Sequence, residues 1–412
     1  MPNLLKLTLI LFLWLISAPL WAQSYGCTDP LAENYNPAAT QNDGSCIYSD
    51  AIINPVTSWE LPETVYETSG LIIWENKLWT HNDNDDINLY AFDTTNVNNY
   101  EAYPLTGTIN IDWEEISQDE HFVYIGDFGN NHNGNRTNLQ ILRIEKQSLL
   151  DQAPVIDTIR FSYELQTDFS PSGPNNTDFD CEAFIVTSDS IYLFTKQWVS
   201  EKTSLYSLPK QPGTYIAHHL ADLDVEGLIT GSTYLEEKRL VVLTGYSNLL
   251  QPFLFLLYDF QEYQFFSANK RKIQIGLPFH QVEAVTTVDG LSYFISNEQF
   301  TYSVITIPQK LHLLDLSEFL EDYLLAQPAG IAEDRSRALT VYPNPALDGF
   351  VYLIHTDLHG HSYRITDLSG KVVRTGIIRG NRSRLDLSGL ENGMYLLSLP
   401  DLPGATGKIV VK

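Results

Sequence analysis

A short acidic motif recurs along residues 51–325, and each copy opens a strand-length apolar run. Its glutamates are Glu114, Glu182, Glu226 and Glu283, and Ser69 fills the same slot in the first copy. Each unit continues with a turn and a second apolar run that ends in polar residues. Carboxylates gathered from several repeats are the ligands that a hard cation such as Ca²⁺ prefers. The pattern therefore predicts metal binding or metal-assisted hydrolysis.

The spacing of the repeat indicates its architecture. The five slots lie 45, 68, 44 and 57 residues apart, which suits four-stranded propeller blades with loops of variable length. The fold class expected for residues 51–325 is all-β, a β-propeller with five blades favoured and six as the main alternative. The strand Val56–Leu61 precedes the first unit and is expected to complete the last blade and close the ring.

Propeller geometry gathers the polar positions at one end of the channel. The first strand of each blade lines the axis and the second runs back beside it, so the start of one and the end of the other share a face. The metal ligands expected at this mouth are Glu114, Glu182, Glu226, Glu283, Asp83, Asp127 and Glu298. The ligand-binding residues expected there are His81, Asn82, Asn130, Lys196 and Asn297.

Several interpretations of the mouth stay open. The glutamates either hold Ca²⁺ or cap backbone donors and fix the packing between blades, and these roles are compatible. Lys196 and His81 are also available to offset the charge. A binding module would use Trp79, Trp113 and Trp198 as aromatic platforms, whereas a hydrolase would use one carboxylate or His81 as its base. A purely structural surface protein would hold neither metal nor ligand.

Two of the motifs carry a family resemblance. Asp-Val-Glu-Gly-Leu at 224–228 and Ile-Ser-Asn-Glu at 295–298 resemble segments of phytase-like calcium-dependent propellers. This resemblance implies a Ca²⁺-assisted hydrolase of phosphoesters or esters. Phosphoester binding also needs a basic cluster, and only Lys196 and Arg136 are expected near the mouth. The preferred expectation is therefore a module that binds Ca²⁺ and an extracellular ligand, with the hydrolase as the alternative.

The N-terminal segment predicts export. Residues 1–22 combine Lys6, a short apolar run and a small-residue end, the pattern of a secretory signal peptide. Residues 23–50 form a module bounded by Cys27 and Cys46, which are expected to pair in an oxidising compartment. The buried-strand pattern around Cys181 predicts a structural thiol. In the module, the oxygens that either bind Ca²⁺ or form Asx turns belong to Asp29, Asn34, Asn36 and Asp43.

The C-terminal region predicts a small β-sandwich over residues 338–412. Short apolar runs alternate there with Gly, Asn, Asp and Pro. Its motifs are Leu-Thr-Val-Tyr-Pro-Asn-Pro at 339–345, Asp-Leu-Ser-Gly-Lys-Val-Val at 367–373 and Leu-Glu-Asn-Gly-Met-Tyr at 390–395. Together they resemble the C-terminal sorting domain of the type IX secretion system of Bacteroidetes. The resemblance implies that the type IX machinery is a partner and that the sorting domain is removed on secretion or attachment at the outer-membrane surface.

The net charge of the chain limits the kinds of partner that it can bind. The 412 residues carry a net charge of −26, which argues against nucleic acid and anionic membranes. Once the signal is removed, no transmembrane segment is expected.

A short capped helix is expected from Asp315 to Leu325, followed by a linker over 326–337.

Overall fold

The computed structural model describes residues 23–94, 96–302, 305–326, 340–342, 346, 349–354, 360–367, 371–379, 382–400 and 406–411. The chain divides into two compact units, Met1–Leu324 and Leu325–Lys412. The predicted signal peptide and linker residues 327–337 lie outside the described residues, so both remain predictions.

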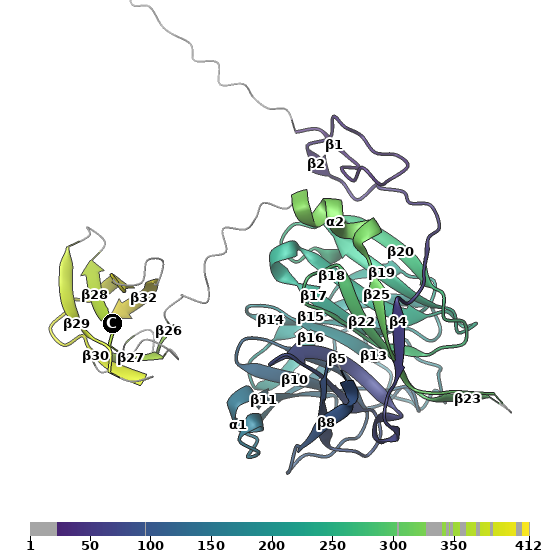
Figure 1. Ribbon diagram of the computed structural model, residues 1–412, viewed down its shortest axis with the longest axis horizontal. Coiled ribbons are helices and arrows are strands. Elements are labelled where there is room, and N and C mark those ends of the chain that lie inside the picture. Colours follow the sequence, from purple (N-terminus) through teal and green to yellow (C-terminus); the bar gives the residue numbers. More distant parts are fainter. Residues whose placement is uncertain are drawn as a thin grey trace, which may run out of the picture. The chain divides into compact units, whose positions relative to one another are not determined.

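Five four-stranded antiparallel sheets form a ring in the first unit (Figure 1). Each inner strand contacts the inner strands of the blades on either side, so the ring is closed. The five-bladed propeller expected from the repeat is confirmed. The blades are, in order, β5(Thr68–Trp74), β6(Lys77–Asn82), β7(Asn88–Asp93), β8(Asn96–Pro104); β9(Trp113–Gln118), β10(Phe122–Asp127), β11(Gln140–Glu145), β12(Ile156–Tyr163); β13(Asp180–Val186), β14(Ser190–Lys196), β15(Lys202–Pro209), β16(Gly213–Asp224); β17(Leu228–Leu235), β18(Leu240–Tyr246), β19(Pro252–Tyr258), β20(Asn269–Ile275); and β21(Val282–Thr287), β22(Ser292–Asn297), β25(Lys310–Asp315), β4(Thr57–Glu60).

The last blade takes its outer strand from the start of the chain. β4 pairs antiparallel with β25, with Thr57 opposite Leu313 and Glu60 opposite Lys310. This is the ring closure expected from Val56–Leu61. The sequence predicts a later strand of this blade at Tyr302–Ile307. The structure instead has a separate hairpin of β23(Phe300–Tyr302) and β24(Ile305–Ile307) there.

Blades 2 and 3 are joined at their outer edges. β12 pairs parallel with β16, so their strands form one eight-stranded sheet. The blades pack face to face through buried apolar residues, because central strands such as β14, β18 and β19 have both faces covered. Pairing the outer strands satisfies backbone groups that would otherwise form two open sheet edges.

The N-terminal module packs on blade 4. It holds β1(Tyr25–Gly26), β2(Gln41–Asn42) and the expected disulfide between Cys27 and Cys46. The strand β3(Ile52–Ile53) then pairs parallel with β20. Asp29 accepts hydrogen bonds from the hydroxyls of Tyr48 and Tyr258, so the module and blade 4 share a buried polar contact.

Helices are few and peripheral. They are α1(Lys146–Leu150), α2(Ser317–Ala326) and the 3-10 helices η1(Glu63–Val65), η2(Glu236–Lys238) and η3(Phe265–Ser267). α2 is the helix expected after Asp315, whose carboxylate accepts the Ser317 amide hydrogen bond. Across the described residues, the longest apolar helical stretch falls short of what a membrane span requires.

The second unit contains two sheets. β26(Thr340–Tyr342), β27(Phe350–Ile354) and β30(Arg382–Asp386) form one, and β29(Val372–Ile377), β28(Ser362–Asp367), β31(Gly393–Ser398) and β32(Thr406–Val411) form the other. They share one apolar core that includes Val351, Ile365, Leu397 and Ile409. This two-sheet arrangement is the expected small β-sandwich.

Candidate functional site at the channel mouth

Each inner strand carries a β-bulge near its start, and the bulges present the repeated acidic side chains. In blades 2, 3 and 5 the strand pairing skips one residue, which is Glu114, Glu182 and Glu283 respectively. A bulge re-aims the side chain of the extra residue, and bulges are common beside functional sites. The repeated motif is therefore a repeated local geometry at the mouth.

Blade 4 departs from the predicted alignment. Its bulge falls at Thr230, between the pairs Ile229–Gly245 and Gly231–Thr244. Glu226 lies four residues earlier, where its side chain is exposed and its carbonyl accepts a hydrogen bond from Lys272 of the outer strand β20. The expectation that Glu226 is a metal ligand at the mouth is therefore corrected, because Glu226 precedes the strand that lines the axis.

Three carboxylates lie close enough to share one cation. Glu114, Asp180 and Glu182 each offer an oxygen within 4.8 Å of the others, and all three are buried. Glu283 from blade 5 is also buried, with 7 % of its surface exposed. The half-buried Asp83, Asp112 and Glu298 complete the set on the solvent side. These seven groups are called the mouth carboxylates.

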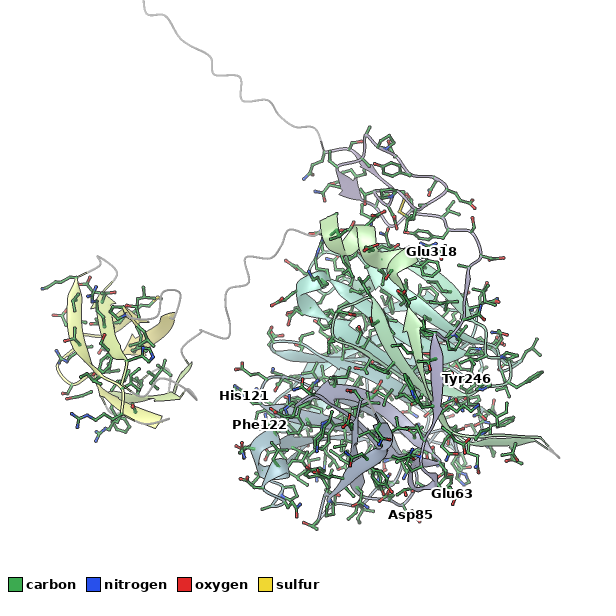
Figure 2. The ribbon with its side chains drawn as sticks, viewed as in Figure 1. Glu63, Asp85, His121, Phe122, Tyr246 and Glu318 are labelled. Atoms are coloured by element: carbon green, nitrogen blue, oxygen red, sulfur yellow. A yellow bond between two sulfur atoms is a disulfide. The ribbon has the colours of Figure 1, made fainter. Side chains whose placement is uncertain are left out.

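Lys196 is the cation buried among them. Its Nζ donates to Glu182 Oε2 at 2.5 Å and to the hydroxyl of Tyr246 at 3.1 Å. It also lies 4.6 Å from the ring centroid of Trp198, within cation–π range. Tyr246, labelled in Figure 2, ends β18 and brings blade 4 to the mouth. Lys196 thus links blades 3 and 4 and offsets one negative charge.

The mouth carboxylates have raised pKa values. Burial, together with repulsion from Glu298 and Glu67, raises the pKa of Asp83 to about 8. Burial raises the pKa of Glu182 to about 8 although Lys196 opposes the rise, and burial raises that of Glu298 to about 7. The pKa values of Glu114 and Glu283 also lie well above the usual range, because both are buried beside other carboxylates.

Two kinds of carboxylate meet at the mouth. Asp180 is held by Trp198 Nε1 at 2.7 Å and by the backbone amide of Asn130 at 2.6 Å. In contrast, no residue in the described part of the chain donates a hydrogen bond to the carboxylates of Glu114, Glu283, Asp83 or Glu298. Buried carboxylates normally receive donors, because desolvation of an unpaired charge costs several kcal/mol. Of these four groups, Glu114 belongs to the triad that could hold a metal ion, Glu283 is also buried, and Asp83 and Glu298 are half-buried.

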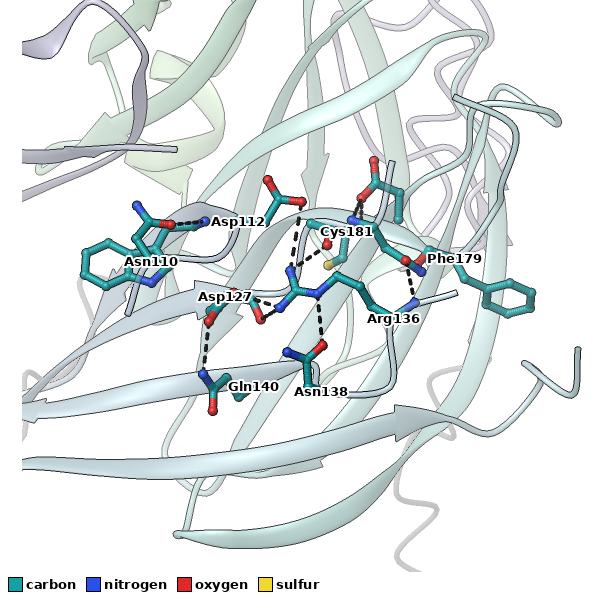
Figure 3. Close-up of polar contacts among 12 residues, drawn as sticks. Asn110, Asp112, Asp127, Arg136, Asn138, Gln140, Phe179 and Cys181 are labelled. Carbon is teal, nitrogen blue, oxygen red and sulfur yellow. Dashed lines mark hydrogen bonds and ion pairs between the residues drawn. The ribbon is translucent and has the colours of Figure 1, made fainter. Parts of the chain in front are cut away.

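A second cation, Arg136, holds the blade 2 side (Figure 3). Its guanidinium donates to Asp127 Oδ1 at 2.9 Å and to the Gly129 carbonyl at 2.7 Å, and lies 3.9 Å from Asp112. Gln140 donates to the other Asp127 oxygen at 2.9 Å. Asp127, expected to bind metal, is therefore occupied by protein donors. The contacts also fix the turn that passes over Glu114.

Gly129 lets two carboxylates approach this turn. A Cβ at this position would lie 2.1 Å from Glu114 Oε1 and 2.4 Å from Asp112 Oδ2. Any side chain would therefore displace both carboxylates. Glycine here marks a close approach that shapes the site.

Several predicted mouth residues have structural roles instead. His81 is fully buried against Trp113, 5.9 Å between ring centroids, and its Nδ1 contacts the Asn82 carbonyl at 3.1 Å. Asn82 donates to the Thr64 carbonyl, and Asn297 donates to the Pro308 carbonyl. Trp79 and Trp113 are buried core residues rather than platforms, whereas Trp198 remains half-buried at the mouth.

Asn130, which was predicted to bind ligand, stabilises the loop that follows β10. Its side chain donates to the Phe179 carbonyl at 3.0 Å and accepts from the Arg136 amide at 2.9 Å. The loop is then joined to residues 166–175 by backbone bonds such as Asn175 to Asn131 at 2.8 Å. Asn130 therefore fixes the loop beside the mouth.

Glu115 performs the structural role that had been considered for the repeated glutamates. It is fully buried, and its two oxygens accept the backbone amides of Ile116 at 2.9 Å and Ser232 at 2.7 Å. Because Ser232 belongs to β17, this carboxyl group links blade 2 to blade 4 across the channel. Burial raises its pKa well above the usual range despite these donors.

The expected site omitted four residues that the structure shows to matter. Asp112 and Asp180 each stand two positions before a bulge glutamate, so the recurring Asp-x-Glu spacing was a usable signal. Tyr246 ends a predicted strand, as Lys196 does. Glu115 follows Glu114 directly, and sequence spacing could not distinguish which of the two faces the channel interior.

The C-terminal residues supply the identification. Residues 340–412 match the family described as secretion system C-terminal sorting domain. The second unit is a type IX sorting domain. It implies recognition by the type IX machinery and export of this chain to the cell surface or beyond it. A search of curated proteins finds no match to the chain.

Solved structures resemble the chain at low identity. PorZ, a surface component of the type IX secretion system of Porphyromonas gingivalis, is 11 % identical with a TM-score of 0.31 over 90 % of this chain and 49 % of PorZ. This chain thus spans about half the length of PorZ. Myxococcus xanthus glutaminyl cyclase is 9 % identical with a TM-score of 0.38, covering 65 % of this chain and 99 % of that one. Neither likeness supports a statement about activity.

Proposed function

We propose that the exported propeller is an extracellular recognition module whose mouth binds Ca²⁺ and a ligand. The observation that carries the proposal is the pair of buried carboxylates, Glu114 and Glu283, that receive no hydrogen bond from the described residues. Glu114 also belongs to the triad with Asp180 and Glu182 whose oxygens lie within 4.8 Å of one another. A bound cation removes the repulsion among these groups and replaces the missing donors.

The ligand set favours Ca²⁺ over transition metals. The mouth offers carboxylate oxygens from Asp and Glu, with neither His nor Cys in the triad. Ca²⁺ accepts six to eight oxygens in flexible geometry, whereas Zn²⁺ favours nitrogen and sulfur. Glu114 and Asp180 would form the inner part of the site, and Glu182 would bind after partial release from Lys196.

A recognition module is preferred to the metal-assisted hydrolase. His81, considered as a catalytic base, is buried between blades 1 and 2, and burial lowers its pKa to about 4. Lys196 and Arg136, the cations near the mouth, are already paired with carboxylates. A phosphoester would thus meet a negative surface, which opposes phytase-type chemistry.

Thermal unfolding of residues 23–412 tests the proposal. Protein stripped with chelator is expected to show a melting temperature that rises with Ca²⁺, because a ligand that binds only the folded state stabilises it by about 2.7 kcal/mol at 100 times its Kd. Glu114→Gln should remove most of the rise by deleting one ligand charge. Asp43→Asn in the N-terminal module is the control and should retain it.

The opposite outcome is equally clear. An unchanged melting temperature at millimolar Ca²⁺ would reject the calcium site. A rise that persists in Glu114→Gln and Glu283→Gln would place the cation elsewhere in the chain.

A further inference from the structure

An arc of exposed apolar side chains borders the acidic mouth. Val199, Leu249 and Phe279 are 61 %, 82 % and 61 % exposed. They stand in the loops β14–β15, β18–β19 and β20–β21, which lie on the mouth face because they follow second strands or precede an inner strand. These three residues are called the apolar arc.

Hydrogen bonds join the three loops into one surface. Asn248 donates to Glu201 at 2.7 Å, linking the loops of Leu249 and Val199. The Phe279 amide donates to the Leu250 carbonyl at 2.8 Å, linking the loops of Phe279 and Leu249. The loops that carry the arc are therefore joined to one another by hydrogen bonds.

The backbone is strained to hold this rim. Glu201, Leu250 and Phe279 have φ values of 53°, 54° and 66°, one in each loop. The left-handed region is unfavourable for non-glycine residues and most of all for bulky ones. Phe279 has this unfavourable backbone conformation although its side chain is exposed. Packing of the side chain in the core therefore does not account for the conformation.

The charge beside the arc defines the partner. Glu283 lies four residues after Phe279, and the Glu298 amide donates to the Gln281 carbonyl in the same loop at 3.2 Å. Neither glutamate side chain receives a donor from the described residues. Lys196, which already pairs with Glu182, is the cation that acts on both groups. A basic side chain on a ligand that covers the arc would therefore complement these two carboxylates.

We propose that the apolar arc seats a polypeptide partner that combines apolar side chains with a lysine or arginine directed at Glu283 and Glu298. Apolar contacts on Leu249 and Phe279 supply buried area, and the basic side chain supplies orientation. The inference concerns blades 4 and 5 and does not require the metal. It goes beyond calcium binding by assigning the chemistry of the partner.

Fluorescence anisotropy with defined peptides tests this surface on residues 23–412. The probe is a labelled peptide of about 12 residues in which leucines are flanked by lysines, and its match replaces every lysine with glutamate. Titrations in chelator keep the result independent of calcium binding. The lysine peptide is expected to bind the wild type, and the glutamate peptide is not.

Variants distinguish the arc from general charge attraction. Leu249→Ser with Phe279→Gly should weaken the lysine peptide by about tenfold, the effect of losing about 1.4 kcal/mol of contact. Glycine suits φ near 66°, so the melting temperature should not fall. Val288→Ser, 66 % exposed on the opposite face, is the matched control. Equal binding by the double variant and wild type, or by both peptides, would overturn the proposal.

Discussion

Two acid-rich regions of this chain were both candidates for Ca²⁺, and the structure separates them. In the N-terminal module, Asp29 Oδ1 accepts the Leu31 amide at 2.9 Å, and Asp43 Oδ1 accepts the Ser45 amide at 3.0 Å. Asn34 and Asn36 accept the amides of Ile47 and Ala38 in the same way. The contacts of Asp29, Asn36 and Asp43 are Asx-type, and that of Asn34 joins two parts of the module 13 residues apart. Together they stabilise a loop too small to form its own core.

Two of the mouth carboxylates, Glu114 and Glu283, are in the opposite condition. They are more deeply buried than Asp43, yet they lack donors from the described residues. Backbone amides occupy the polar side chains of the module, whereas the carboxylates of Glu114 and Glu283 receive no donor from the described residues. Spacing along the chain does not distinguish the two conditions, because it does not show where backbone amides point.

Removing the internal cation should have the largest effect. Lys196→Met leaves Glu182 buried without its partner, and breaking a buried pair costs about 3–5 kcal/mol. Urea unfolding in chelator measures the loss, and Ca²⁺ should restore part of it by occupying the same carboxylates. Lys272→Met is the control, since Lys272 donates to the carbonyls of Val225 and Glu226. Equal calcium rescue of both variants would contradict the comparison.

The next effect comes from the structural glutamate. Glu115→Ala leaves the buried amides of Ile116 and Ser232 without an acceptor, which should lower the free energy of unfolding by about 2–4 kcal/mol. Glu115→Gln retains an acceptor oxygen and should lose less. Both variants should keep the calcium-induced rise in melting temperature, and its loss in Glu115→Gln would show that Glu115 belongs to the metal site.

The pH dependence should be smaller. The pKa values of Glu182 and Glu298, about 8 and about 7 when folded, exceed their ordinary value of 4.5. The folded chain therefore binds more protons than the unfolded chain between pH 4.5 and about 8. Metal-free stability should fall with rising pH across this window, by about 1–2 kcal/mol after screening by solvent.

Calcium should remove that slope and release protons on binding, because its ligands must ionise. Calorimetry in buffers of different ionisation enthalpy measures the release. A metal-free protein whose stability rises from pH 5 to 8 would show that the mouth carboxylates titrate normally.

The smallest effect is expected in the module. Asp29→Asn retains an acceptor for the Leu31 amide but loses one for the hydroxyls of Tyr48 and Tyr258, which should cost about 1 kcal/mol. Its calcium response should equal that of the wild type. A reduced response, measured as the shift in melting temperature, would return the module to the list of calcium sites.

The propeller and its closure were predictable because they follow from repeated apolar runs, which local periodicity specifies. β4 was predicted as a strand that precedes the first unit and completes the last blade. The missed strand β25 lies directly after the β23–β24 hairpin, whose apolar residues competed for the same position in the repeat. Local patterns do not show which of two adjacent strands enters a sheet.

The position of the candidate site at the channel mouth was predictable from the sequence. The residues that form the site were less predictable. Glu226 has the same motif as Glu182, but the bulge of blade 4 falls at Thr230, because bulge position depends on pairing with β18. Asp127 was expected to be a ligand, yet Arg136 nine residues later neutralises it. Such partnerships depend on loop conformation, which the spacing of residues does not define.

The closure of the ring also sets how the chain bears mechanical load. β4 and β25 are antiparallel, and Thr57 lies opposite Leu313, so the chain enters one strand and leaves the other at the same end of the pair. Tension between these points separates the ladder one hydrogen bond at a time instead of shearing it, because the bonds lie perpendicular to the strands. In a protein pulled through handles placed directly before β4 and directly after β25, blade 5 should open first. Single-molecule extension would show this as an early low-force step, absent when a disulfide joins β4 to β25.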